Sequence, residues 1–133
     1  MSDSIDDKIK TAIVIDDDHD MVDVFCDILQ ILQIKVVGRG YDGNEAVDLY
    51  QKLKPELVIL DIMMPHYDGI YALEKIREID ADAKVMVVTA DSTSATNEKL
   101  KRLKPTVVVY KPADTETILG IVSGLMSVRN HNI

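Results

Sequence analysis

The sequence predicts a doubly wound α/β domain, in which helices cover both faces of a parallel β-sheet. Five short apolar runs rich in β-branched residues recur along the chain, with room for one helix between successive runs. The runs are nearly continuous rather than alternating, which is typical of strands buried on both faces. Right-handed crossovers would then place the connecting helices on both sides of the sheet. We therefore predict five consecutive βα units.

The five predicted strands share an apolar, mostly β-branched composition and stop at a polar residue or a turn. We expect them at Thr11–Ile15, Ile34–Val37, Leu57–Leu60, Val85–Val88 and Val107–Tyr110.

The segments between these strands show the apolar spacing of amphipathic helices. One face of the first helix is lined by Met21, Phe25, Ile28 and Leu32, one face of the second by Ala46, Leu49, Tyr50 and Leu53, and one face of the third by Leu73, Ile76 and Ile79. The fourth, Ser94 to Leu103, has the weakest apolar face. The last, Asp114 to Val128, is the most apolar and is expected to begin at Asp114 as its N-cap.

Length and composition indicate one soluble domain. The 133 residues are 47% hydrophobic, so residues 10–128 can form a single core, with a flexible segment 1–9 before it and a tail 129–133 after it. A net charge of −8 disfavours direct binding to nucleic acid or an anionic membrane. The single cysteine, Cys26, is expected to be a buried thiol, and with no apparent signal peptide or membrane span the protein is expected in the cytoplasm.

Polar residues stand where the predicted strands end, the edge at which such sheets bind ligands. Asp16 and Asp17 follow the first strand, Asp61 the third, Thr89 the fourth and Lys111 the fifth. Each close pair of carboxylates would repel by about 4 kcal/mol at about 4 Å, so a bound cation would stabilise the cluster. Oxygen ligands with room for water suit Mg²⁺, and the lysine and hydroxyl beside them suit phosphoryl transfer. The neighbouring Asp18 and Asp20 are better explained as start signals of the first helix.

These residues occur within four ordered motifs, "VIDDD", "LVILDIMMPHYDG", "VVTA" and "YKP". Asp17 and Asp61 are 44 residues apart, Asp61 and Thr89 are 28 apart, and Thr89 and Lys111 are 22 apart. In this order and spacing the chain resembles the receiver domains of two-component response regulators, of the stand-alone chemotaxis-regulator type. The resemblance covers Lys10 to about Val128. It implies a flavodoxin-like (βα)₅ fold with strand order 2-1-3-4-5.

The resemblance also implies a role for each acidic residue of the cluster. Asp61 would be the phosphoacceptor, forming an acyl phosphate with a phosphoryl group from a phosphohistidine. Asp17, Asp61 and the backbone carbonyl of Met63 would ligate Mg²⁺ directly, and Asp16 would act largely through a bound water.

Further roles fall on the fourth and fifth strand ends. Lys111 would pair with a phosphoryl oxygen, Thr89 would move inward to hydrogen-bond the phosphoryl group, and the N–H of Ala90 would assist. The bond from Lys111 to Pro112 is expected to be cis, as is common in the family. Such a protein would promote its own phosphorylation and dephosphorylation without being a conventional turnover enzyme.

One position departs from the family pattern. The residue three before the lysine, usually an aromatic that swings inward with the threonine, is Val108. The nearest aromatic, Tyr110, is expected to point away from the face that Val108 occupies. With a weak fourth helix, phosphorylation is expected to act through local ordering of residues 90–104.

The expected partners are proteins. A sensor histidine kinase or phosphotransfer protein would supply the phosphoryl group, and a separate downstream effector would read the result. The apolar last helix carries Gly120 and Gly124 four residues apart, which leaves open either a helix packed on its own sheet or a homodimer surface there.

Three other functions compete with this interpretation. A flavodoxin-like electron carrier is disfavoured because "DDDHD" would repel a flavin phosphate. A phosphatase that uses Asp61 as nucleophile would need an acid at Met63. A pseudo-receiver that only docks other proteins remains the alternative, although the complete set of site residues argues against it. The scattered histidines show no zinc-ligand spacing.

Overall fold

The computed structural model describes residues 9–127, and the chain alternates strand and helix throughout. The elements are β1 (Lys10–Ile15), α1 (His19–Ile31), β2 (Ile34–Gly40), α2 (Gly43–Leu53), β3 (Leu57–Asp61), α3 (Gly69–Ile79), β4 (Val85–Thr89), α4 (Ser94–Leu103), β5 (Val107–Tyr110) and α5 (Thr115–Met126). The strands form one parallel sheet in the order β2-β1-β3-β4-β5. The predicted doubly wound fold and strand order are confirmed. Most of the segment 1–9 and the whole of the tail 129–133 lie outside the described residues.

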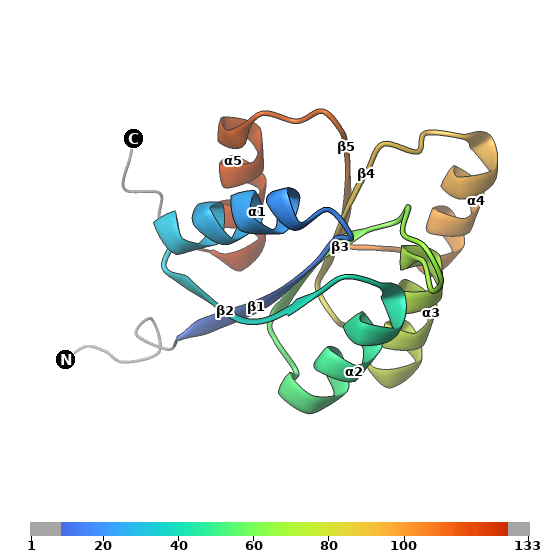
Figure 1. Cartoon of the computed structure of the whole chain (residues 1–133), viewed down its shortest axis with the longest axis horizontal. Helices are drawn as coiled ribbons and strands as arrows, with labels where there is room; N and C mark the ends of the chain where they lie inside the picture. Colours follow the sequence, from blue (N-terminus) through green and yellow to red (C-terminus); the bar gives the residue numbers. More distant parts are fainter. Residues whose placement is uncertain (1–8, 128–133) are drawn as a thin grey trace.

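Helices cover both faces of the sheet and divide the core into two layers (Figure 1). One layer packs α1 and α5 against the sheet, with Phe25 and Val22 at its centre and Cys26 buried as predicted. The other packs α2, α3 and α4 against the opposite face, around residues such as Leu73 and Ile76. Because successive strand residues point to opposite faces, β1, β3 and β4 supply both layers and are buried along their whole apolar length.

β2 is longer than predicted. It continues past Val37 to Gly40 and pairs with β1 on both sides of a register shift between Ala12 and Ile13, at which Val37 is skipped. The predicted strand stops before Gly38 because glycine is disfavoured in β-strands. In this strand, however, the packing requires a glycine. A Cβ on Gly38 would lie 3.0 Å from the side chain of Leu49 on α2. The absence of a side chain at this position thus lets α2 lie close to the sheet.

The helix ends follow the capping residues that the sequence indicates. Asp18 accepts hydrogen bonds from the N–H groups of Asp20 and Met21 and caps α1, while Asp114 accepts from Thr117 and caps α5. The predicted start signals are therefore confirmed. Among residues 9–127, no helix is long and apolar enough to cross a membrane.

α5 uses its apolar residues mainly within the domain. Four of them are buried, and Ile121 and Leu125 are partly buried against the same core layer. Gly120 and Gly124 face open space, since a Cβ on either would meet nothing within 4 Å. The described helix ends at Met126, and the predicted end at Val128 lies outside the described residues. The homodimer surface on this helix stays a prediction.

Candidate functional site: an acidic pocket at the carboxyl end of the sheet

The central strands deliver the predicted site residues to one edge of the sheet. From β1 the chain leaves toward β2 on one side, while β3 lies on the other, so the ends of β1 and β3 flank the point where strand order reverses. Asp16 follows β1 directly and is 2% exposed, and Asp61 ends β3 and is 5% exposed. Two carboxyl groups are thus buried side by side.

Three carboxylates form the floor of the site. Asp16, Asp17 and Asp61 each offer an oxygen within 4.8 Å of the other two. Asp17 is exposed, so the group opens to solvent on one side. The structure therefore brings together all three predicted acidic ligands.

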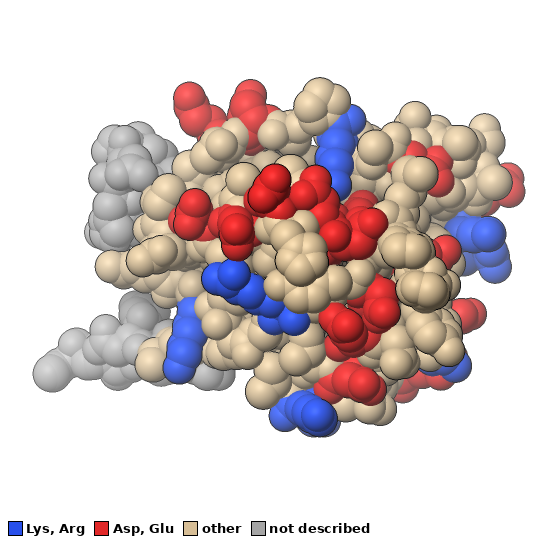
Figure 2. All heavy atoms as spheres, viewed as in Figure 1, with Lys and Arg blue, Asp and Glu red and all other residues tan. Residues whose placement is uncertain are grey.

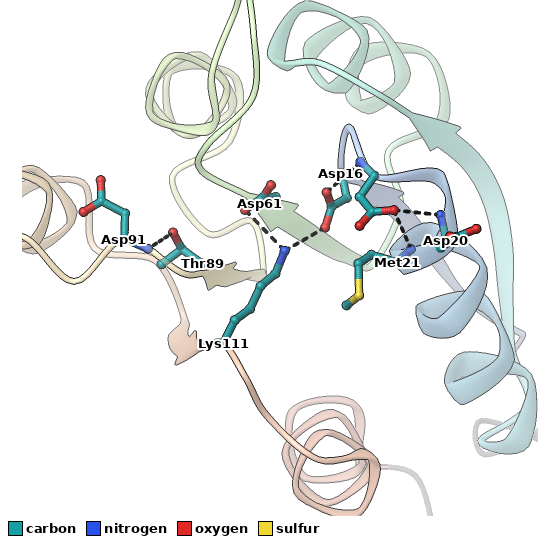
Figure 3. Close-up of polar contacts among 8 residues, drawn as sticks. Asp16, Asp20, Met21, Asp61, Thr89, Asp91 and Lys111 are labelled. Carbon is teal, nitrogen blue, oxygen red and sulfur yellow. Dashed lines mark hydrogen bonds and ion pairs between the residues drawn. The ribbon is translucent and has the colours of Figure 1, made fainter.

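Lys111 reaches this group from the end of β5 (Figure 3). Its Nζ donates to Asp16 Oδ2 at 3.1 Å and lies 3.8 Å from Asp61 Oδ1. The other oxygen of Asp16 accepts the N–H of Asp18 at 3.0 Å. Asp16 is therefore held by both oxygens. The Asp61 carboxyl has a longer contact with the lysine and is also in hydrogen-bond contact with Asp16 and with the backbone of Ile62.

The surroundings of Asp61 disfavour its charged form. Burial, together with the nearby Asp16 carboxylate, raises the pKa of Asp61 well above its usual value, although Lys111 acts in the opposite direction. Figure 2 shows acidic side chains gathered on the face that includes the start of α1, with few basic groups among them.

This arrangement fits Mg²⁺. Carboxylate oxygens open to water on one side are the donors that this ion prefers, and one lysine cannot neutralise three acids. Asp17 and Asp61 could ligate the ion directly, since Asp16 is already engaged by Lys111 and by the N–H of Asp18.

Thr89 ends β4 and is fully buried, but its hydroxyl is turned away from Asp61. Its Oγ1 accepts the N–H of Asp91 at 2.9 Å, on the side away from Lys111 (Figure 3). The hydroxyl must rotate before it can contact a group on Asp61.

The expectation for Tyr110 is wrong. Residues two apart on a strand share a face, and Val108 and Tyr110 line the same groove between α4 and β5, together with Leu100 and Pro105. The Tyr110 hydroxyl donates to Asn97 Oδ1 on α4 at 2.8 Å, with the side chain 44% exposed. An aromatic residue therefore does link β5 to α4, although from a different position in the strand.

The remaining predicted features lie close by. Met63 follows Asp61 by two residues and exposes its side chain, and Ala90 is exposed directly after Thr89. The peptide bond between Lys111 and Pro112 is cis, as expected. Gly69 was not singled out from the sequence, yet a Cβ there would collide with the backbone of Asp61. The signal was available in "DG" before an apolar helix, because only glycine permits so close an approach.

A family model described as the response regulator receiver domain matches residues 12–123, which is most of the chain. The chain belongs to the response-regulator receiver family. Receiver domains of this family generally bind Mg²⁺ in an acidic pocket and are phosphorylated there, and they interact with histidine kinases and downstream effectors.

Two relatives match this chain over more than two thirds of their own length. Protein CcdB of Bacillus subtilis is 35% identical over 115 residues, which are 86% of this chain and 96% of CcdB. The chemotaxis protein CheY of Thermotoga maritima is 38% identical over 81 residues, 61% of this chain and 68% of that protein.

Solved receiver structures share the fold. The chain is similar to one in a crystal structure of the CheX–CheY–BeF₃–Mg²⁺ complex from Borrelia burgdorferi, with a TM-score of 0.85 and 26% identity over 92% of this chain and 94% of that one. The response regulator domain of Thermotoga maritima CheB superimposes with a TM-score of 0.77 and 27% identity, covering 95% and 98% of the two chains.

Proposed function

We propose that this receiver accepts a phosphoryl group on Asp61 from the phosphohistidine of a sensor kinase or phosphotransfer protein and passes the signal to a separate protein. The observation that carries the proposal is the pairing of two buried carboxyl groups with one shared lysine at the strand-order reversal. Three carboxylates and one lysine leave the site with two negative charges, which one divalent cation would neutralise, and the site is open to solvent at Asp17.

The chemistry follows from the position of Asp61. One of its carboxylate oxygens would attack the phosphorus, forming a P–O bond as the P–N bond to the histidine breaks, and the electron pair of that bond would stay on the imidazole nitrogen. Bound Mg²⁺ would neutralise charge on the phosphoryl oxygens. Hydrolysis would reverse the modification, with water attacking phosphorus and releasing phosphate from Asp61.

Lys111 lies where it could bind a phosphoryl group on Asp61. Its Nζ is 3.8 Å from Asp61 Oδ1, near enough for a small movement to bring it onto an oxygen of a phosphoryl group there. Thr89 would rotate from Asp91 toward the same group, and the N–H of Ala90 and the carbonyl of Met63 would serve the phosphoryl group and the metal, respectively.

The cellular setting follows the same proposal. The protein would act in the cytoplasm as a stoichiometric signal carrier rather than a turnover enzyme. CheY in the Borrelia complex is seen with CheX, and we propose a protein partner of that general kind for this chain. A pseudo-receiver that never receives phosphate is the alternative.

Incubation with acetyl phosphate, followed by intact mass measurement, distinguishes the two. The proposal predicts a gain of one phosphoryl group that requires Mg²⁺ and is lost in Asp61→Asn. Asp48→Asn, which replaces an exposed acid on α2, is the matched control and should label normally. A gain without metal, or one that survives Asp61→Asn, would contradict the proposed site, and no gain under any condition would favour the pseudo-receiver.

A further inference from the structure

The start of α4 is connected to the hydroxyl of Thr89 through a single residue, Asp91. The N–H of Asp91 donates to Thr89 Oγ1 at 2.9 Å. Thr89 is fully buried, and this N–H holds its hydroxyl away from Asp61.

Asp91 is itself held at both carboxylate oxygens. Oδ1 accepts the N–H of Thr93 at 2.9 Å, and Oδ2 accepts the hydroxyl of Thr96 at 2.6 Å. These contacts keep the pKa of Asp91 below its usual value. The loop is closed into an Asx turn, and the direction of the Asp91 N–H is set by a bond from the first turn of α4.

Polar contacts of this kind carry much of the attachment of α4. Leu100 is its one buried residue. At its carboxyl end, Arg77 on α3 donates to the carbonyls of Leu103 and Lys104. Nearer its amino end, Asn97 accepts the Tyr110 hydroxyl. With the carboxyl end of α4 held by Arg77, the β4–α4 connection is restrained by Asp91 with its two threonine partners and by a longer contact from Asn97 to the carbonyl of Ser92 at 3.4 Å.

We propose that the hydrogen bond from Thr96 to Asp91 is a restraint that holds Thr89 in its outward orientation and so lowers the affinity of the site for a phosphoryl group. Thr89 cannot turn toward Asp61 without leaving the Asp91 N–H, and a turn held by Thr96 cannot follow it. Thr96 and Asp91 are thus positioning residues. The inference rests on the proposed function of Asp61.

The test measures the affinity for beryllofluoride, a phosphoryl stand-in, by fluorine NMR in the presence of Mg²⁺. Thr96→Val removes the hydroxyl at nearly constant shape, and we expect binding about three- to tenfold tighter, the effect of one ordinary hydrogen bond on a two-state equilibrium. Thr96→Ser keeps the hydroxyl and should restore the wild-type value. Mg²⁺ affinity without beryllofluoride should not change, whereas general damage to the site would alter it.

α5 supplies a matched control. Thr117 is the third residue after its cap, as Thr96 is, and its N–H donates to the cap carboxylate of Asp114 at 2.7 Å. Its partner Asp114 follows β5 rather than β4, so this pair does not bond to Thr89. Thr117→Val should bind beryllofluoride like the wild type.

Each outcome decides a question. Asp91→Ala should bind beryllofluoride more tightly, as Thr96→Val does. If the wild type binds normally but Thr96→Val binds with unchanged or weaker affinity, this inference alone is overturned. Failure of the wild type to bind beryllofluoride with Mg²⁺ would overturn the proposed function, and this inference with it.

Discussion

Replacing Asp61 with asparagine should stabilise the metal-free protein at neutral pH, although it removes the proposed phosphoacceptor. The reason is that Asp61 is buried beside Asp16, and Lys111 contacts it only at 3.8 Å. The asparagine would keep the shape of the aspartate side chain without its charge.

The magnitude follows from the pKa. Burial and Asp16 raise the pKa of Asp61 from 3.8 to about 7, and each unit corresponds to about 1.4 kcal/mol, so the full shift is worth about 4 kcal/mol above pH 7. The attraction to Lys111 is already included in this pKa. Because the asparagine amide must itself be buried and would place an uncharged group beside Lys111, we expect a smaller net gain of about 1–3 kcal/mol.

The sign can be checked by pH. Between about pH 4 and pH 7 the folded wild type keeps a proton on Asp61 that the unfolded chain releases, so its free energy of unfolding falls as pH rises. The advantage of Asp61→Asn should therefore grow across this range and level off above it.

Urea denaturation in EDTA, with both proteins at several pH values, gives the comparison. Asp48→Asn, an exposed control, should lie within about 0.5 kcal/mol of the wild type. Added Mg²⁺ should stabilise the wild type more than Asp61→Asn. A variant less stable than the wild type at pH 7.5, or an advantage independent of pH, would refute the electrostatic reasoning.

Four further predictions concern other parts of the molecule. Gly69→Ala should cost more than about 2 kcal/mol of stability in urea denaturation, because its Cβ would collide with the backbone of Asp61; a smaller loss would mean that this approach can relax. His66→Gly should raise stability by about 0.5–1 kcal/mol in the same assay, since residue 66 has φ of 67°, and a loss would show that its side chain has an unrecognised role. Amide exchange across residues 90–104 should slow on phosphorylation, and unchanged exchange would contradict the hypothesis that phosphorylation orders this segment. Sedimentation with and without beryllofluoride tests the homodimer through α5, which a strict monomer in both conditions would rule out.

The outline of the site could be predicted because each of its parts follows a recognisable strand. Asp61 and Thr89 end runs of continuous apolar residues, and parallel strands bring their carboxyl ends to one edge of the sheet. The order of the elements alone is enough to place these residues together. The same regularity accounts for α1 and α5, whose caps Asp18 and Asp114 precede apolar faces.

The rest depends on contacts that no local pattern encodes. β2 runs through Gly38 and Gly40 because of how closely α2 packs, which is a tertiary effect. The outward orientation of Thr89 depends on the N–H of Asp91, and so on the turn that Thr96 closes. Arg77 reaches carbonyls 26 and 27 residues away, at a distance in sequence that spacing rules do not cover.

The central claim is that Asp61 carries the phosphoryl group. An acyl phosphate on a carboxylate is reduced by borohydride to an alcohol, so Asp61 would become homoserine, and peptide mass spectrometry after labelling with acetyl phosphate and Mg²⁺ locates the change. The account predicts homoserine at position 61 and at no other aspartate. Homoserine at Asp16 or Asp17, or none at all in protein that has gained a phosphoryl group, would contradict it.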